Sequence, residues 1–297
     1  MINGYNIKSL DSDFDKLKSS YLYACSKDIE VIKPGNVYID SPHKDTSSLD
    51  YLRSAHDSSK ILFNKDLSFG NRVYLSVKET RKNTHVNTNL GIILLVAPIV
   101  QAFFKSEKKE LSSAINHLVK EANYDDTKYI CKAINLANPG GLGTRKNLDT
   151  RSLPDVKLLD IMSESSKYDR ISYQYTRGFE DILRFIVPNI IEKRKSIENT
   201  DVLLSIVFLE TLAEIPDTHI WRKFGEKIAK KTSNQASDLI KIILKDCSYS
   251  RAIRQICALD YEYKNKGINP GTTADLLLAS IMIERVFSLS HKRDCDK

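Results

Sequence analysis

Apolar residues recur at helical spacing along almost the whole chain of 297 residues. Clear apolar stripes run through residues 11–30, 48–63, 87–105, 109–122, 126–137, 157–195, 203–212, 217–245, 248–265 and 276–287. Strand signals are nearly absent, because only Asn71 to Val77 alternates, and weakly. The chain shows no repeat and no linker rich in Gly, Ser or Pro. This pattern predicts an all-α fold, a single globular multi-helix domain over residues 1–297.

The cysteines and the apolar segments indicate in which cellular compartment the protein resides. Cys25, Cys131, Cys247, Cys257 and Cys295 form no C-x-x-C pair, which is typical of reduced thiols in a cytosolic protein. The N-terminus is polar and lacks the apolar run of a signal peptide. Residues 90–104 are strongly apolar but contain Pro98 and Gln101, which favours a buried helix over a membrane span. We therefore expect a cytoplasmic protein without a membrane partner.

The formal charge of +7 gives a mild bias toward anionic partners. Such partners include nucleic acid and phosphorylated small molecules. Basic residues gather at Lys193 to Lys195 and along Arg222 to Lys231. A solvated helix face is the better interpretation of runs of this kind.

Three Pro-Gly pairs punctuate the helical pattern, and each follows a polar residue. They are Lys33-Pro34-Gly35-Asn36, Asn138-Pro139-Gly140-Gly141 and Asn269-Pro270-Gly271-Thr272. Proline fixes φ and the next glycine permits φ > 0, so each pair predicts a sharp turn between helices. The turns can be connections only. Their shared composition, however, makes a second interpretation equally open, in which they line one polar pocket.

Two polar segments lead into helices through residues suited to an anion. Thr272-Thr273-Ala274-Asp275 offers hydroxyls and backbone N–H groups at a helix start, where the helix dipole favours phosphate. Asn87-Thr88-Asn89-Leu90-Gly91 leads into the apolar helix in the same way, and its glycine permits close approach.

The candidate catalytic side chains each have a structural alternative. Asp217 precedes Thr218-His219 at a helix restart, where it is a good N-cap and also a candidate Mg²⁺ ligand or base. Asp275 is equally open, since an acid is favourable in any first helical turn. Arg170 and Gln174 share a helix surface that is either pocket wall or solvent-facing.

Known catalytic signatures are absent. The chain has no G-x-x-x-x-G-K-[ST] motif, and no G-x-G-x-x-G follows a strand. H-E-x-x-H and G-x-S-x-G are missing as well. The remaining Asp, Asn, Lys and Thr residues on glycine turns suit Mg²⁺–phosphate binding better than catalysis by a Ser or Cys nucleophile.

Six stretches in order resemble the triphosphoribosyl-dephospho-CoA synthase family over roughly residues 20–290. They are Lys33 to Val37, Asn87 to Gly91, Asn138 to Gly143 with Asp155-Val156, Asp169-Arg170 through Gly178-Phe179, Asp217 to Ile220 with Arg222 to Gly225, and Asn269 to Leu276. The second and third stretches depart from the T-H-K-G and A-R-G-E-A patterns of citrate-lyase members. The departure is similar to the branch found in archaea and methylotrophs.

The resemblance implies an all-helical pentosyltransferase that joins ATP to the 2′-hydroxyl of dephospho-CoA and releases adenine. It implies Asp217, Asp275 and Asp155 as catalytic residues, with Asp217 and Asp275 also as ligands of the Mg²⁺ that accompanies ATP. The implied substrate and phosphate ligands are Lys33, Gly35, Asn36, Asn87, Asn89, Asn138, Gly140, Gly141, Arg170, Gln174, His219, Lys223, Asn269, Gly271, Thr272 and Thr273.

Other interpretations stay open at this point. A related transferase would act on a pterin or another coenzyme precursor. A non-catalytic helical module would bind nucleotide or RNA, although the many acids in the turns argue against nucleic acid. A homodimer is also open.

Overall fold

The computed structural model describes residues 14–39, 41, 47–83, 89–105, 110–140, 149–153, 155–245 and 248–295. The helices of the first half are α1 (Phe14–Glu30), α2 (Ser48–Leu62), α3 (Phe69–Asn83), α4 (Leu90–Lys105), α5 (Leu111–Glu121), α6 (Tyr124–Ala137), the short η2 (Thr150–Ser152), α7 (Leu158–Ser165) and α8 (Arg170–Thr176). The helices of the second half are the π-helical η3 (Asp181–Ile186), α9 (Val187–Lys193), α10 (Thr200–Glu214), α11 (Thr218–Phe224), α12 (Glu226–Lys245), α13 (Tyr249–Asn265) and α14 (Gly271–Cys295).

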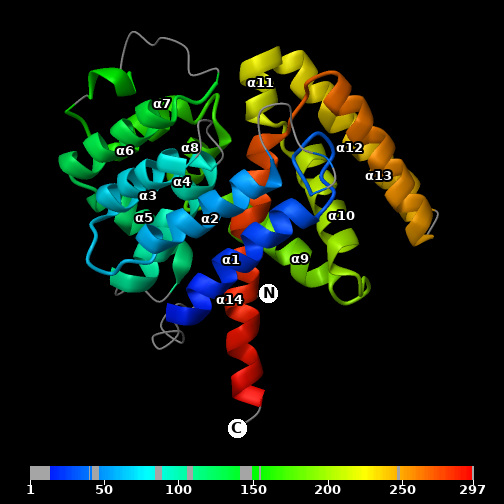
Figure 1. The fold of residues 1–297 in the computed structure, drawn as a ribbon, viewed down its shortest axis with the longest axis horizontal. Coiled ribbons are helices and arrows are strands. Elements are labelled where there is room, and N and C mark those ends of the chain that lie inside the picture. The colour runs from blue at the N-terminus through cyan, green and yellow to red at the C-terminus, as the bar shows by residue number, and fades with distance from the viewer. Residues whose placement is uncertain are drawn as a thin grey trace.

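Helix α14 runs through the middle of the molecule. Figure 1 shows α2 to α8 on one side of it and α9 to α13 on the other, with α1 lying across it. It packs against α1, α4, α8, α9, α10, α11 and η3. Every residue from Leu276 to Glu284 is buried, so this helix has no solvent-facing stripe along that stretch. The last helix of the chain is thus the axis of the fold, and its first turn lies where both sides meet.

Helix α4 forms the second element of the core. Residues 92–102 are buried on all sides, as the predicted apolar helix requires. None of the helices in the described residues combines the length and apolar character needed to cross a membrane. The prediction of a buried helix in this segment is therefore confirmed.

The all-α prediction is confirmed, with corrections in detail. The described residues contain no strand beyond one isolated bridge between Tyr38 and Ser41. The weak alternation from Asn71 to Val77 was misleading, because this segment lies inside α3. Val73 and Val77 are four residues apart and both buried, which places them on one helix face.

Two long predicted helices are interrupted. Residues 157–195 form α7, α8, η3 and α9, and the break between α8 and η3 lies at Gly178 and Phe179, which both adopt positive φ, 59° and 63°. Residues 217–245 form α11 and α12, separated at Gly225, which has a φ of 86°. These breaks let short helices turn their ends toward the centre of the molecule.

Candidate active site

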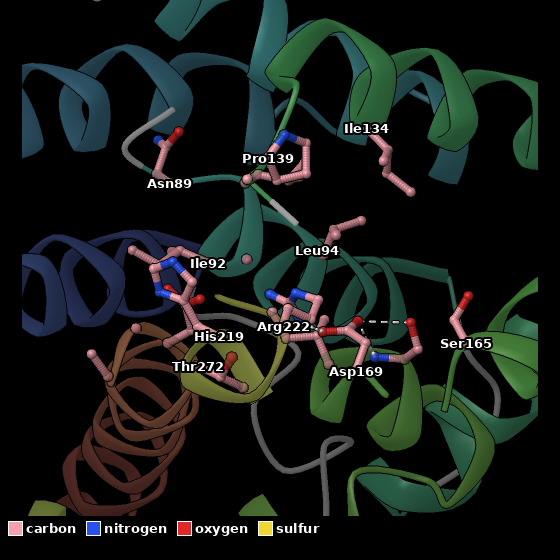
Figure 2. Close-up of a pocket in the computed structure, with 18 of the residues that line it drawn as sticks. Asn89, Ile92, Leu94, Ile134, Pro139, Ser165, Asp169, His219, Arg222 and Thr272 are labelled. Carbon is pink, nitrogen blue, oxygen red and sulfur yellow. Dashed lines mark hydrogen bonds and ion pairs between the residues drawn. The ribbon is translucent and has the colours of Figure 1, made fainter. Parts of the chain in front are cut away.

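A cavity of about 700 Å³ lies at the first turn of α14 (Figure 2). All three Pro-Gly turns contribute to its wall, through Asn36, through Pro139 and Gly140, and through Asn269 and Gly271. The prediction that these turns converge on one cavity is confirmed. A volume of this size is in the range of small-molecule sites.

The first and third turns pack directly on each other. Gly35 has a φ of 81°, and a Cβ at this position would lie 2.5 Å from the carbonyl oxygen of Ile268. The Gly35 N–H donates to Asp260 Oδ1 at 2.8 Å. Beside it, Asn36 Nδ2 donates to Asn269 Oδ1 at 3.0 Å. Only glycine permits this approach, which fixes both amide side chains at the cavity wall.

Asp275 brings a perturbed carboxyl group to the cavity. It lines the cavity from the first turn of α14. Desolvation raises the pKa of Asp275 well above its usual range, and the negative charges of Asp28, Asp217 and Asp169 raise it further, while Arg222 opposes the shift. No hydrogen bond to its carboxylate comes from the described residues. A carboxyl group with a raised pKa keeps its proton to higher pH than an ordinary aspartate does.

Gly91 allows the Asp275 carboxyl its place. A Cβ on Gly91 would lie 2.0 Å from Asp275 Oδ2 and 2.8 Å from Ile171 Cδ1. Gly91 is the second residue of α4 and lines the cavity itself. The start of the apolar core helix is therefore pressed against the carboxyl group.

Replacing Gly91 by alanine is expected to lower kcat by about tenfold to 100-fold, because the new methyl group displaces the Asp275 carboxyl. The helix itself tolerates alanine better than glycine, so we expect little change in the far-UV circular dichroism or in the melting temperature. Steady-state kinetics and thermal melting on the same preparation check both parts. Full activity in Gly91→Ala would show that the exact placement of the carboxyl is unimportant.

Asp217 lies behind the cavity wall and joins two helices. Its Oδ1 accepts the Ile220 N–H at 3.0 Å as the N-cap of α11. Its Oδ2 accepts both the N–H and the Oγ1 hydroxyl of Thr273, each at 2.8 Å. The carboxylate is buried and is not part of the cavity lining. Asp217 therefore positions the first turn of α14, which carries Asp275.

Asp217→Ala is expected to lower the melting temperature by about 4–8 °C. The change removes a buried N-cap and leaves the Thr273 donors without their acceptor, at a cost of about 2 kcal/mol. Asp217→Asn, which keeps one acceptor oxygen, should lose less. Differential scanning calorimetry of both variants measures the difference, and an unchanged melting temperature in Asp217→Ala would contradict the positioning role.

Arg222 supplies positive charge to the cavity. Its NH1 donates to Asp169 Oδ1 at 2.7 Å. The other oxygen of Asp169 caps α8 by accepting from Ser172 N–H at 3.0 Å and Ser172 Oγ at 2.8 Å. Within the part of the chain that the structure describes, Arg222 is the one Lys or Arg that lines the cavity. His219, three residues earlier on α11, lines the same wall.

Arg170 and Gln174 share a helix face, as predicted, but they face a buried carboxylate. Arg170 binds Asp181 through Nε and NH2 at 2.6 and 2.8 Å. Gln174 Nε2 donates to the same carboxylate at 2.5 Å. Neither residue lines the cavity. The hydrogen bonds from Arg170 and Gln174 to Asp181 therefore hold α8 against η3.

The predicted site residues, including those just described, fall into four groups according to their place in the structure. Those that line the cavity are Asn36, Asn89, Gly140, His219, Asn269, Gly271, Thr272 and Asp275. Those packed behind its wall are Lys33, Gly35, Asp217 and Thr273. Those placed elsewhere are Arg170, Gln174, Asn138, Asp155 and Lys223, the last three of which are exposed. Asn87 and Gly141 lie outside the described residues.

Lys33 is an example of a predicted ligand that is enclosed by protein. Its side chain is buried, and Nζ pairs with Asp28 Oδ1 at 2.7 Å and also donates to the Asp28 carbonyl oxygen. Asp28 itself lines the cavity. Lys33 therefore holds a carboxylate of the site in place.

Sequence reasoning missed several cavity residues. Asp28, Asp169, Trp221 and Arg222 all line the cavity, and none was predicted as a site residue. Arg222 carries a usable signal, because it follows His219 by three residues and shares its helix face. Trp221 is the only tryptophan of the chain, but a single aromatic residue gives no such signal.

Comparisons with known proteins agree on one family. The sequence profile described as ATP:dephospho-CoA triphosphoribosyl transferase matches residues 14–294. Among proteins of curated function, none matches the chain significantly. One similar crystal structure is that of an Archaeoglobus fulgidus protein named for an inferred triphosphoribosyl-dephospho-CoA synthase activity. It is 20% identical, with a TM-score of 0.62, and the match covers 78% of this chain and 97% of the other. At this identity the structural match concerns the fold.

Proposed function

Because the chain belongs to the ATP:dephospho-CoA triphosphoribosyl transferase family, we propose that its central cavity is the site where these two substrates react. The enzyme transfers the triphosphoribosyl group of ATP to the 2′-hydroxyl of dephospho-CoA and releases adenine. The observation that carries the proposal is the profile match over residues 14–294, which includes every residue lining the cavity.

Asp275 is the proposed base. In the reaction the bond between ribose C1 and the adenine nitrogen breaks, and a bond from C1 to the acceptor oxygen forms. The hydroxyl proton passes to Asp275 and leaves with adenine. In its ionised form, a carboxylate with a raised pKa is a stronger proton acceptor than an ordinary aspartate. The acids around it stabilise the positive charge that develops on the ribose.

The triphosphate is proposed to lie between Arg222 and the start of α14. Arg222 offers guanidinium donors on one wall. Gly271 and Thr272 line the cavity at the N-terminus of a 25-residue helix, where the helix dipole favours negative charge. The two features give an anion both a charged partner and a favourable dipole.

Mg²⁺ is proposed to enter with ATP. It takes most of its ligands from phosphates and water, and needs only one or two carboxylates from the protein. In the described residues, no group of three His, Cys, Asp or Glu side chains is arranged to hold a metal ion. Asp28 lines the cavity and fits this smaller requirement, whereas Asp275, a predicted ligand, is assigned to the proton transfer. Asp217, the other predicted ligand, uses both oxygens in hydrogen bonds. The ion would neutralise part of the triphosphate charge.

The family assignment does not favour a pterin or another coenzyme precursor as the acceptor.

We also propose a cytoplasmic location. It is supported by the three described cysteines, Cys25, Cys131 and Cys257, which are free thiols.

Adenine release from Mg·ATP tests the function directly. We expect adenine only when dephospho-CoA is present, together with an equal amount of triphosphoribosyl-dephospho-CoA detected by chromatography and mass spectrometry. Omission of Mg²⁺ should prevent the reaction. The proposal fails if adenine appears at the same rate without dephospho-CoA, or if no adduct forms while ATP binds.

A further inference from the structure

The two ends of the cavity differ in chemistry. Figure 2 shows Asn89, His219 and Thr272 toward one side, and Leu94 and Ile134 toward the other. The apolar lining comes from four helices and contains Leu94, Ile134, Ile161, Met162 and Ile171. Gly271 and Thr272 of the proposed phosphate site lie on α14, which is not one of these four helices.

Helix α7 lines the apolar end with two apolar side chains and one hydroxyl group. Ile161, Met162 and Ser165 lie within one turn and share a helix face. Ile161 and Met162 are only 3% and 2% exposed, so the surface that remains faces the cavity. The Ser165 hydroxyl lines the cavity as well, and no described residue hydrogen-bonds to it.

The apolar end begins beside the reacting group. Ile171 Cδ1 and Asp275 Oδ2 both lie within 2.8 Å of the position that a Cβ on Gly91 would take. These two atoms are therefore neighbours. A planar group that packs against the apolar residues would have its attached ribose next to the Asp275 carboxyl.

The charges near this end give a phosphate no particular advantage, because each acid there is paired with an arginine. Two acidic residues line the cavity beside the helices of this end, where Asp149 caps η2 and Asp169 caps α8. Asp149 pairs with Arg151 at 2.8 Å, and Asp169 pairs with Arg222 at 2.7 Å. An uncharged heteroaromatic ring suits apolar walls with a hydroxyl at the edge, because its faces are apolar and its rim forms hydrogen bonds.

We propose that Leu94, Ile134, Ile161, Met162 and Ser165 form the subsite for the adenine that ATP loses, with Ser165 as a hydrogen-bonding partner of its rim. The inference rests on the proposed function, because it assigns one part of the ATP substrate to one end of the same cavity. It makes α7 a determinant of base specificity.

Two variants and one matched control test the subsite kinetically. Ser165→Ala should raise the KM for ATP by about fivefold to tenfold, the effect of one lost hydrogen bond. Ile161→Ala should raise it by about tenfold through lost apolar contact. Both should weaken product inhibition by adenine and leave the KM for dephospho-CoA unchanged. Ser163→Ala, an exposed position on the same helix, should behave as wild type.

Adenine binding itself is measured without turnover. Trp221 lines the cavity and is the only tryptophan, so its fluorescence should change on titration with adenine. Ser165→Ala, which should fold normally, is expected to weaken this binding about fivefold. The subsite is overturned if adenine does not bind, or if the variants raise the KM for dephospho-CoA instead. Adenine binding that depends on Ser165 in a protein without transferase activity would support the subsite and reject the proposed function.

Discussion

Replacing Asp275 by asparagine is expected to lower kcat by about 100-fold to 10,000-fold and to raise the melting temperature. The loss of activity follows from removing the proposed base, since general base catalysis contributes a factor of this size. The gain in stability follows from the surroundings of the carboxyl. Desolvation and the charges of Asp28, Asp217 and Asp169 disfavour its ionised form in the folded protein. A neutral amide of the same shape avoids that cost.

The stability gain should depend on pH. In the unfolded chain Asp275 ionises near its ordinary pKa of 3.8, whereas the pKa in the folded protein is raised well above it. Between these two values the folded state binds a proton that the unfolded state has lost. The contribution of Asp275 to the free energy of unfolding therefore falls as pH rises through this window. Asp275→Asn should match wild type near pH 3.8 and melt at a higher temperature, by about 2 °C or more, at pH 7.

Asp155→Asn is the matched control for this experiment. Asp155 is 73% exposed and pairs only weakly with Lys128, at 3.3 Å. Its replacement should change neither kcat nor the melting temperature measurably. Calorimetry across the pH range, combined with the adenine-release assay, gives both readouts. A lower melting temperature in Asp275→Asn at pH 7 would show that the ionised carboxyl is stabilised in the folded protein.

The fold could be predicted from sequence because its determinants are local. Helical spacing and Pro-Gly turns depend on residues a few positions apart, and both appear in the structure as expected. The convergence of the turns was also predictable in outline, from their shared composition. The fit of Gly35 against the Ile268 carbonyl could not be predicted, because these groups are more than 200 residues apart in sequence.

The roles of charged residues were harder to predict, because a side chain's partner decides its role. Arg170 and Lys33 suit phosphate by composition, yet each pairs with a nearby aspartate and neither lines the cavity. Asp217 was assigned both a capping and a catalytic interpretation, and its partner Thr273 supports the first. Nothing local in the sequence distinguishes these outcomes. Only the packing of α8, α11 and α14 around one point does so.

Arg222→Ala is expected to lower kcat/KM for ATP by about 100-fold, mainly through KM. Arg222 is the one Lys or Arg among the described residues that lines the cavity. Charge-assisted hydrogen bonds to phosphate are strong. Its removal also leaves Asp169 Oδ1 without its partner, which adds negative charge close to the triphosphate. Arg222→Lys keeps the charge without the planar fork of donors, and should lose about tenfold.

Lys223→Ala tests which residue binds phosphate, Arg222 as we propose from the structure or Lys223 as the sequence predicted. Lys223 is the neighbouring residue and was one of the predicted substrate or phosphate ligands. It is exposed, however, and its Nζ lies 3.5 Å from the Gly267 carbonyl oxygen. We expect its replacement to leave kcat/KM within about twofold of wild type, because exposed pairs contribute little. A large loss in Lys223→Ala with normal activity in Arg222→Ala would place the triphosphate outside the cavity described above.

The double variant Arg222→Ala with Asp169→Asn then shows how Arg222 acts. Asparagine is a good N-cap, so it should keep the hydrogen bond from Ser172 that begins α8. If Arg222 works only by neutralising Asp169, the double variant should recover most of the lost activity. We expect it to recover less than tenfold, because the direct contact between the guanidinium and the phosphate is missing in both variants. The size of this recovery divides the contribution of Arg222 between screening an acid and binding the substrate.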